Sequence, residues 1–308
     1  MLELPDAWVW DSWCLDDGQE YHLFFLFASR ALLDPARRHF RSSIGHAVST
    51  DLRTWKRLPD ALVRGEPGDF DDLAVWTGSV IAHPAGGWAL FYTGATRTAA
   101  GVVQSIGIAR SKDLTVWERV AKNPVLQADP RWYETLADGT WGDEAFRDPF
   151  VFADESGHGF HMLITARANH GAVDDRGVVG YAWSADLDHW QLRAPLSEPG
   201  CGFAQYEVMQ VRRVEGRAQL FFSCLPPERA SWTAPEDCGM WSADARSLVG
   251  PFDLREARPL TTSELYAGPV VFDRARDEWV YLAFEHDEAQ PDFGRVIDPV
   301  RLPLNPSR

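Results

Sequence analysis

Residues 8–27 contain the unit that the rest of the chain repeats. They read Trp8-Val9-Trp10-Asp11-Ser12-Trp13, then a turn at Asp16-Asp17-Gly18, then the apolar run Tyr21-His22-Leu23-Phe24-Phe25-Leu26-Phe27. A nearly continuous apolar run of this length favours a strand that is buried on both faces. The carboxylate of Asp11 stands among three indoles, whose flat apolar faces suit the stacking of sugars. Taken alone, the stretch is equally consistent with a buried tryptophan cluster in which Asp11 caps a turn.

The unit returns four more times along the chain. Comparable apolar runs occur at residues 88–92, 160–164, 218–222 and 279–284. Each follows a turn and another apolar segment, and these leading segments lie around Asp11 and at residues 76–81, 146–152, 206–211 and 267–272. Ser-x-Asp turns follow at residues 49–55, 111–117 and 184–190, with a degenerate copy at residues 242–248. Aspartates in such turns bond local backbone N–H groups, so we interpret them as turn formers.

Repeated units of about four short strands predict a propeller, because one such unit cannot bury both of its faces alone. The short turns favour antiparallel meanders, and no segment has sustained helical periodicity. We therefore predict an all-β fold: a five-bladed β-propeller with four-stranded antiparallel blades around a central channel, forming a single domain over residues 1–308. The longest insertion between repeats, residues 129–144, is expected to form a loop over one face.

Composition restricts the partners and the compartment. The 308 residues are 45% hydrophobic, with 14 Trp and 17 Phe, which is enough for a large core. The formal net charge of −15 argues against nucleic acid as a partner and fits a neutral substrate better. The four cysteines show no Cys-x-x-Cys pair and no histidine at zinc spacing, so we expect reduced thiols and neither a metal nor another cofactor. No signal-peptide pattern and no membrane-spanning apolar run is present, so we expect a cytoplasmic protein without a membrane partner.

Acidic residues occupy matching places in three of the five leading segments. When these segments are aligned on the apolar runs that follow them, Asp11, Asp148 and Glu207 fall at the same height. The matching places in the other two repeats are near Thr77 and Gly268. The innermost strands of a propeller line its central channel. Repeat symmetry therefore predicts that the three carboxylates converge on one pocket.

Three carboxylates in one pocket cannot share one pKa, because like charges hold one of them protonated. One carboxylic acid beside one carboxylate is the arrangement that glycoside hydrolysis requires. Glu207 is expected to be the acid, since the residues on either side of it are apolar and favour the neutral form. Arg147 is expected to hold its neighbour Asp148 ionised. A metal ion bound by the three carboxylates is the competing interpretation, although no further Asp, Asn or His joins them at that level.

Four motifs occur in a fixed order along the chain: Trp10-Asp11-Ser12-Trp13, Trp76-Thr77-Gly78-Ser79, Arg147-Asp148-Pro149 and Glu207. In order and type they resemble the motifs of the levansucrase and inulosucrase family and of its relatives, the invertases. The resemblance runs from about Trp8 to Val211, and the blade pattern extends it to about Phe284. It implies a single five-bladed propeller that cleaves or transfers β-fructofuranosyl units with retention of configuration.

The resemblance also implies roles for particular residues. Asp11 would be the nucleophile, Asp148 would stabilise the transition state through the fructosyl hydroxyls, and Glu207 would be the acid/base. The residues expected to bind substrate around them are Trp10, Trp76, Ser79, Arg147, Gln205 and Tyr266, of which Tyr266 is expected to hydrogen-bond a channel carboxylate.

Two positions beside the acid depart from the family's pattern. Gln205 stands where the family has a second Glu, and Val208 stands where it has an Arg, and those positions help to hold sucrose. A small hydrolase of fructosides or fructo-oligosaccharides is therefore favoured over a polymer-forming transferase. The alternatives are an inverting glycosidase of the arabinanase/xylosidase group, which shares the fold, and a sugar-binding propeller without catalysis.

Overall fold

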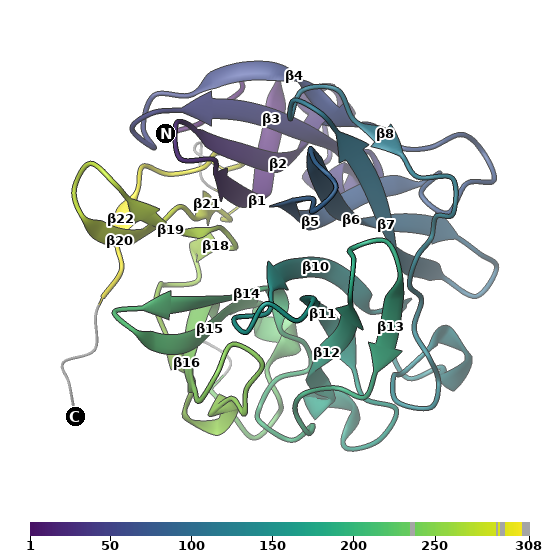
Figure 1. Ribbon diagram of the computed structural model, residues 1–308. Helices are drawn as coiled ribbons and strands as arrows, with labels where there is room; N and C mark the ends of the chain where they lie inside the picture. Colours follow the sequence, from purple (N-terminus) through teal and green to yellow (C-terminus); the bar gives the residue numbers. More distant parts are fainter. Residues whose placement is uncertain (235–237, 288, 290–292, 304–308) are drawn as a thin grey trace.

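The computed structural model describes residues 1–234, 238–287, 289 and 293–303. Figure 1 shows small sheets that follow one another in chain order around a ring. The predicted all-β, five-bladed propeller is confirmed.

The first four blades share one plan, an antiparallel meander whose first strand is the innermost. Blade one consists of β1 (Ala7–Asp16), β2 (Tyr21–Ser29), β3 (Ser43–Ser49) and β4 (Lys56–Leu62). Blade two consists of β5 (Ala74–Ala82), β6 (Trp88–Arg97), β7 (Val102–Ser111) and β8 (Glu118–Arg119), with β9 (Asp143–Glu144) added parallel to β7. Blade three consists of β10 (Phe146–Ala153), β11 (Phe160–Arg167), β12 (Gly177–Ser184) and β13 (Trp190–Arg193). Blade four consists of β14 (Glu207–Val214), β15 (Arg217–Cys224), β16 (Gly239–Ala245) and β17 (Arg258–Pro259).

The fifth blade is divided into two small sheets. One pairs β18 (Leu265–Tyr266) with β21 (Phe284–Glu285), and the other joins β19 (Val270–Asp273), β20 (Glu278–Tyr281) and β22 (Val300–Arg301). The two continuous strands that the sequence predicts at residues 267–272 and 279–284 are therefore interrupted. Pro269 has no N–H for a strand ladder, and a Cβ on Gly268 would lie 1.7 Å from the carbonyl oxygen of Leu282.

The ring is closed by the two ends of the chain. Leu2 and Val296 form an antiparallel bridge, and the Val9 N–H donates to the Gly294 carbonyl at 2.8 Å. β21 accordingly lies beside the purple β1 in Figure 1. This closure positions β1, which carries Asp11, against the fifth blade.

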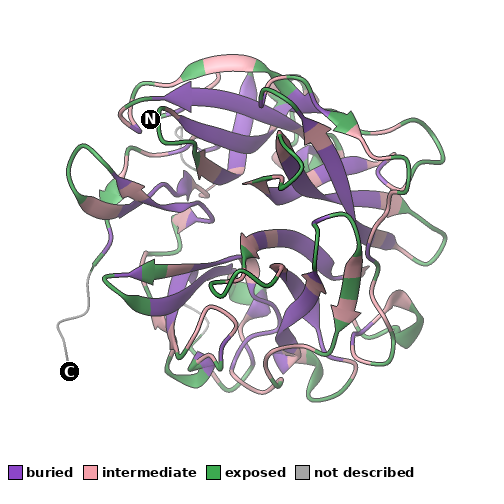
Figure 2. Ribbon diagram, viewed as in Figure 1, coloured by how far each residue is buried: buried purple, intermediate pink, exposed green. Residues whose placement is uncertain are grey.

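The core lies in the inner and middle strands of the blades. In Figure 2 these strands are mostly buried, whereas exposed residues gather in the outer strands and the loops. In β2, for example, all of residues 21–26 are buried, as the apolar run predicted. The Ser-x-Asp turns are also as predicted: Asp51 Oδ1 accepts from the N–H groups of Arg53 at 2.9 Å and Thr54 at 2.7 Å. The degenerate copy is not such a turn, because its Asp244 lies within β16. All four cysteines are free thiols.

The helical segments in the described part of the chain are short 3-10 turns. They are η1 (Arg30–Leu32), η2 (Pro35–Phe40), η3 (Leu136–Asp138), η4 (Val173–Asp175), η5 (Pro226–Glu228) and η6 (Leu254–Glu256). No helix among the described residues is long and apolar enough to pass through a bilayer. Two of these turns, η2 and η5, lie beside the candidate site.

The innermost strands of the first four blades each contain a β-bulge at the same height. The ladder registers shift between Trp10 and Ser12 in β1, between Trp76 and Gly78 in β5, between Arg147 and Phe150 in β10, and between Glu207 and Gln210 in β14. Bulges re-aim side chains, and they recur next to active sites. Three bulge residues hold positive φ angles: Asp11 (33°), Asp148 (57°) and Val208 (49°). Such backbone strain persists only where the surrounding structure enforces it.

Hydroxyl groups on the second strand of one blade form hydrogen bonds with the backbone at the inner edge of the next blade. Thr93 Oγ1 accepts from the Asp148 N–H at 2.9 Å, Thr165 Oγ1 donates to the Tyr206 carbonyl at 2.7 Å, and Ser223 Oγ accepts from the Ala267 N–H at 3.2 Å. These three hydroxyls occupy equivalent ladder positions, opposite Trp76, Arg147 and Glu207 respectively. The bulged strands of blades three and four are therefore each held by the preceding blade.

Candidate active site

The bulges open onto a cavity of about 480 Å³ at one end of the central channel. Asp11, Asp148 and Glu207 all line this cavity, so the structure brings together the three carboxylates that lie far apart in the sequence. Trp10, Trp76, Arg147 and Tyr266 line it as well. The volume is in the usual range for a small-molecule site, roughly 300–1,000 Å³.

Asp11 projects from the bulge of β1. Thr77, at the corresponding bulge of β5, donates a hydrogen bond from Oγ1 to Asp11 Oδ2 at 3.3 Å. Burial, reinforced by the negative charges of Asp148 and Glu207, raises the pKa of Asp11 from 3.8 to about 8, although the cation of Arg38 opposes the shift. Of these three carboxyl groups, Asp11 is therefore the one that retains a proton near neutral pH.

Asp148 is held more rigidly than Asp11. It is 5% exposed, its Oδ2 lies 2.9 Å from Thr165 Oγ1, and the Val208 N–H donates to the same oxygen at 3.2 Å. Burial raises the pKa of Asp148 to about 6, even though the positive charge of Arg147 acts to lower it. Arg147 therefore acts in the predicted direction, but burial outweighs the neighbouring cation and keeps the pKa of Asp148 above its ordinary value.

Arg147 connects Glu207 to the rest of the site. Its guanidinium donates to Glu207 Oε1 and to Gln205 Oε1, and its Nη1 lies 3.3 Å from Gln104 Oε1. The Nε of Arg147 is 3.6 Å from Asp148 Oδ2. On the other side, the Tyr266 hydroxyl donates to Glu207 Oε2, which is the hydrogen bond expected for Tyr266.

These contacts reverse the predicted protonation of Glu207. Burial acts to raise its pKa, but the charge of Arg147 and the hydrogen bonds from Tyr266 and Arg147 together lower it. Sequence reasoning considered only the apolar residues beside Glu207 along the chain, whereas its electrostatic environment comes from other blades. Glu207 is therefore ionised near neutral pH.

Glu207 also departs from the predicted height. In the ladders it pairs opposite Ser223 and directly precedes the bulge residue Val208, as Arg147 precedes Asp148. Glu207 thus lies one residue earlier than the position that Asp11 and Asp148 occupy. Its extra methylene group lets the carboxylate reach the same cavity from that position.

Two of the predicted substrate-binding residues do not line the cavity. Ser79 is buried between blades, where its Oγ donates to the Pro149 carbonyl at 2.7 Å and accepts from the Val151 N–H at 2.9 Å. Gln205 is 3% exposed and supports Arg147 from behind. Both side chains therefore stabilise the site from outside the cavity and do not face a ligand.

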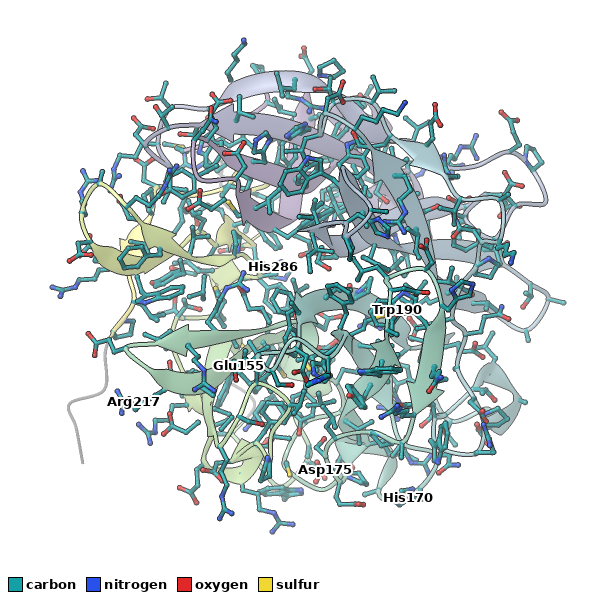
Figure 3. The ribbon with its side chains drawn as sticks, viewed as in Figure 1. Glu155, His170, Asp175, Trp190, Arg217 and His286 are labelled. Carbon is teal, nitrogen blue, oxygen red and sulfur yellow. The ribbon has the colours of Figure 1, made fainter. Side chains whose placement is uncertain are left out.

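Several cavity residues were missed because they come from loops without a repeat signature. Arg38 and His39, from η2, line the cavity, and the His39 carbonyl accepts from Trp76 Nε1 at 2.6 Å. Asp143 reaches the rim from the long insertion at residues 129–144, in agreement with the predicted loop over one face. His286 follows β21, and Figure 3 shows it beside the centre of the ring. Thr77 was recognised as the blade-two counterpart of Asp11, but its hydrogen bond was not.

The three carboxylates have hydrogen-bond partners within the protein. Arg147, Tyr266 and the threonine hydroxyls partner the three carboxylates. Among the residues that the structure describes, no group of three or more His, Cys, Asp or Glu side chains is placed to hold a metal ion.

The cavity holds several carboxylates with separated pKa values beside an apolar wall of indole rings. A propeller cavity of this kind has the arrangement of a glycoside hydrolase. The chain belongs to the family described as glycosyl hydrolases family 32, N-terminal domain, which it matches over residues 14–282. Asp148 and Glu207 lie within the matched range, and Asp11 lies just before it.

Similar proteins agree with this family. The chain is 37% identical over 108 residues to a fructan 1-exohydrolase of Triticum urartu and 41% identical over 108 residues to a fructan 1-exohydrolase of Hordeum vulgare. In both cases the aligned segment is 34% of this chain and 16% of the relative, so the match spans a small part of those longer enzymes.

Solved structures share the fold at low sequence identity. An inulosucrase from Halalkalicoccus jeotgali bound to kestose superposes with a TM-score of 0.75 at 20% identity, covering 99% of this chain and 92% of that one. A levansucrase from Gluconacetobacter diazotrophicus gives 0.74 at 18% identity, covering 99% and 80%. The Bombyx mori GH32 beta-fructofuranosidase gives 0.73 at 18% identity, covering 96% of this chain and 60% of that one. The predicted resemblance to the levansucrase, inulosucrase and invertase group is confirmed.

Proposed function

We propose that this protein cleaves terminal β-fructofuranosyl units from fructosides or fructo-oligosaccharides, with retention of configuration. The observation that carries the proposal is the convergence of Asp11, Asp148 and Glu207 on one cavity in a chain of glycosyl hydrolase family 32. The relatives named as fructan 1-exohydrolases and beta-fructofuranosidases support fructosides as the substrate class.

The roles follow from the environment of each carboxylate. Asp11, at the bulge beside Trp10, attacks the anomeric carbon of the fructosyl unit, and Glu207 protonates the leaving oxygen. In the second half-reaction Glu207 accepts a proton from water, which displaces Asp11 from the anomeric carbon. Asp148, held by Thr165, accepts hydrogen bonds from the fructosyl hydroxyls, and these strengthen in the transition state.

Bound substrate changes the protonation of the cavity in the direction that these roles need. Fructosyl hydroxyls that donate to Asp11 and Asp148 stabilise the charged forms of both groups and so lower their pKa values. A leaving oxygen near Glu207 competes with Arg147 and Tyr266 for its carboxylate oxygens. Substrate binding thus favours the ionised Asp11 that attack on the anomeric carbon requires.

The test begins with sucrose, 1-kestose, inulin and a panel of nitrophenyl glycosides, with fructose release measured by chromatography. Asp11→Asn and Glu207→Gln should each lower kcat by about 10³-fold or more while the circular dichroism spectrum stays that of the wild type. Asp113→Asn, which changes an exposed turn aspartate, is the matched control and should keep full activity. Unchanged turnover in either active-site variant removes that residue from its role, and binding of the panel without cleavage overturns the proposal.

Retention is tested by trapping the intermediate with methanol. A covalent fructosyl-enzyme attacked on its β face yields methyl β-fructofuranoside, which proton NMR distinguishes from the α-anomer. Methyl α-fructofuranoside as the first product would show inversion, as in the arabinanase/xylosidase group, and would exclude Asp11 as nucleophile.

A further inference from the structure

The central channel holds a second cavity on the other side of the bulges, with a volume of about 220 Å³. We call it the lower chamber. Its wall consists mainly of the residues that follow the bulges along β1, β5, β10 and β14. Thr77, Asp148 and Val208 line both this chamber and the active-site cavity, so the two meet at the level of the bulges. The lower chamber is smaller than the usual small-molecule site of roughly 300–1,000 Å³, so it suits an ion better than a sugar.

Arg212 is the only cation among the described residues that line the lower chamber. It is half-buried, and its guanidinium carbon lies 4.9 Å from the centroid of the Phe150 ring. Its Nε donates to the Val270 carbonyl at 3.0 Å, and its Nη1 donates to the Val211 carbonyl at 3.4 Å. These bonds leave Nη2 without an acceptor, and no carboxylate in the described part of the chain forms an ion pair with Arg212.

The charge of Arg212 is not compensated by a protein group. Burial lowers the pKa of Arg212 to about 10, so the side chain is still a cation at neutral pH, and of the described groups only Cys14 acts against this shift. Burial also raises the pKa of the Cys14 thiol, which is therefore neutral and is no counter-ion. Withdrawing a charge from water is costly unless an opposite charge accompanies it. An anion beside Arg212 would offset this cost.

Two further polar groups in the wall of the lower chamber also have no partner. Ser12 Oγ and Trp13 Nε1 are buried, and neither has a hydrogen-bond partner among the residues that the structure describes. Ser12 is only 1% exposed, so bulk water does not satisfy its hydroxyl. An indole N–H and a guanidinium can only donate, and a hydroxyl can donate as well. These groups together are complementary to a ligand that only accepts hydrogen bonds.

Asp148 is the only acid among the described residues of the wall, and it lies away from Arg212. Asp148 Oδ2 accepts from the Val208 N–H at 3.2 Å, at the start of β14. Arg212 follows Val208 by four residues along this strand, which corresponds to roughly 13 Å at about 3.3 Å per residue. The end of the lower chamber at Arg212 is therefore the end that accepts negative charge.

We propose that the lower chamber is a binding site for a small inorganic anion, a halide or phosphate, held by the Arg212 guanidinium with the Ser12 hydroxyl as a second donor. Arg212 also bonds to the Val270 carbonyl, and the Gln210 amide donates to the Gly268 carbonyl at 2.8 Å and accepts from the Val270 N–H at 2.9 Å. The anion therefore joins blades one and four beside the inner edge of the divided fifth blade. It stabilises the ring, and this role does not depend on the fructosidase activity.

The experiment measures Tm of the full chain against anion concentration. Sodium chloride is varied from about 1 to about 300 mM, with the bulky sulfonate HEPES keeping the ionic strength constant, and a second series uses inorganic phosphate at one pH. Above Kd, each tenfold increase in the bound anion should raise Tm by about 3 °C. A rise with chloride alone assigns a halide, and a rise with phosphate alone assigns an oxyanion. A Tm that follows neither anion overturns the site.

Substitutions locate the response. Arg212→Met keeps an unbranched apolar side chain against Phe150 but removes the charge, so Tm should no longer depend on the anion, whatever its absolute value. Ser12→Ala should require about three- to tenfold more anion for the same rise in Tm and should not lower Tm in HEPES alone, because the hydroxyl it removes has no partner there. A wild-type dependence in Arg212→Met would overturn the proposal.

Arg57→Met is the matched control. The guanidinium carbon of Arg57 also lies 4.9 Å from a phenyl centroid, that of Phe25, and Arg57 is half-buried as well, but it forms an ion pair with Asp60. This variant should keep the full wild-type dependence of Tm on the anion, and losing it would contradict a site at Arg212.

A direct readout remains if Arg212→Met does not fold. Crystals of the wild type are soaked with the anion that raises Tm, with bromide in place of chloride so that its anomalous scattering locates it. Density beside Arg212 Nη2 is the expected result. Density confined to the active-site cavity or to the outer surface would overturn the proposal.

Discussion

The raised pKa of Asp11 predicts that this carboxylate destabilises the folded protein at neutral and alkaline pH. A pKa that is higher in the folded state than in the unfolded state means that folding takes up a proton. The stability supplied by the protonated group is fully present below about pH 4 and is lost as the pH rises through about 8. Asp11→Asn cannot ionise, so it should gain stability over the wild type across this window.

The magnitude follows from the shift. Raising the pKa from 3.8 to about 8 corresponds to about 6 kcal/mol between the protonated and ionised limits. Asp148 and Glu207 share the repulsion and take up part of it by titrating themselves, so we expect about half, or about 3 kcal/mol. For a chain of this size about 1 kcal/mol moves Tm by about 2 °C, which gives a gain of about 6 °C.

Differential scanning calorimetry from pH 4 to pH 9 measures the effect. The difference in Tm between Asp11→Asn and the wild type should grow from near zero at about pH 4 to about 6 °C at about pH 8 and then stay level. Asp51→Asn is the control of opposite sign, because hydrogen bonds from the Thr54 and Arg53 N–H groups lower the pKa of Asp51 to about 2. That variant should be less stable than the wild type by a constant amount above about pH 4. Parallel Tm curves for Asp11→Asn and the wild type would refute the electrostatic reasoning.

Three substitutions around the cavity have distinct expected outcomes. Thr165→Val removes the hydroxyl 2.9 Å from Asp148 Oδ2, so the pKa of Asp148 should rise above about 6. The acidic limb of the kcat/KM profile should then move to higher pH, and an unmoved limb would contradict this. Ser79→Ala loses two hydrogen bonds to blade three and should lower the free energy of unfolding, measured by urea titration, by about 1–3 kcal/mol. KM should stay unchanged, and a raised KM would place Ser79 in contact with substrate. Arg147→Lys keeps the charge but not the planar fork that bridges Glu207 and Asp148, so kcat/KM should fall by about 10- to 100-fold; full activity would show that charge alone suffices.

The repeat made the propeller predictable from the sequence. The apolar runs at residues 21–27, 88–92, 160–164 and 218–222 lie in the buried second strands of blades one to four. Blade five was less predictable, because its pairing is decided by where Gly268 and Pro269 interrupt the ladder. A repeated sequence pattern indicates which residues are buried, but it does not indicate where the hydrogen-bonded pairing of two strands is interrupted.

The convergence of the carboxylates was predictable for the same reason, but their protonation was not. Placing Asp148 and Glu207 on inner strands requires only the repeat. Their pKa values depend on Arg147, which bonds across blades to Glu207, and on Tyr266 from blade five. Contacts of this kind cross the ring and leave no trace in the residues next to either carboxylate.

One signal in the sequence could have located the supporting groups. Thr93, Thr165 and Ser223 close the apolar runs of three repeats at the same ladder position, and each hydroxyl bonds to the inner strand of the next blade. A hydroxyl repeated at one register of an otherwise apolar strand indicates a structural partner.

The bulges explain why this scaffold can hold acids close together without unfolding. A bulge turns one side chain per blade into the channel, and the backbone groups that it frees bond to the neighbouring blade instead of to water, as in the Thr93 contact with the Asp148 N–H. The repulsion between Asp11 and Asp148 is therefore resisted by β-ladders on both sides of each bulge. Stability is distributed over the ring, whereas the electrostatic strain is concentrated at one end of the channel. Removing the hydrogen bonds between blades should consequently change the pKa values of the site carboxylates before it changes the fold.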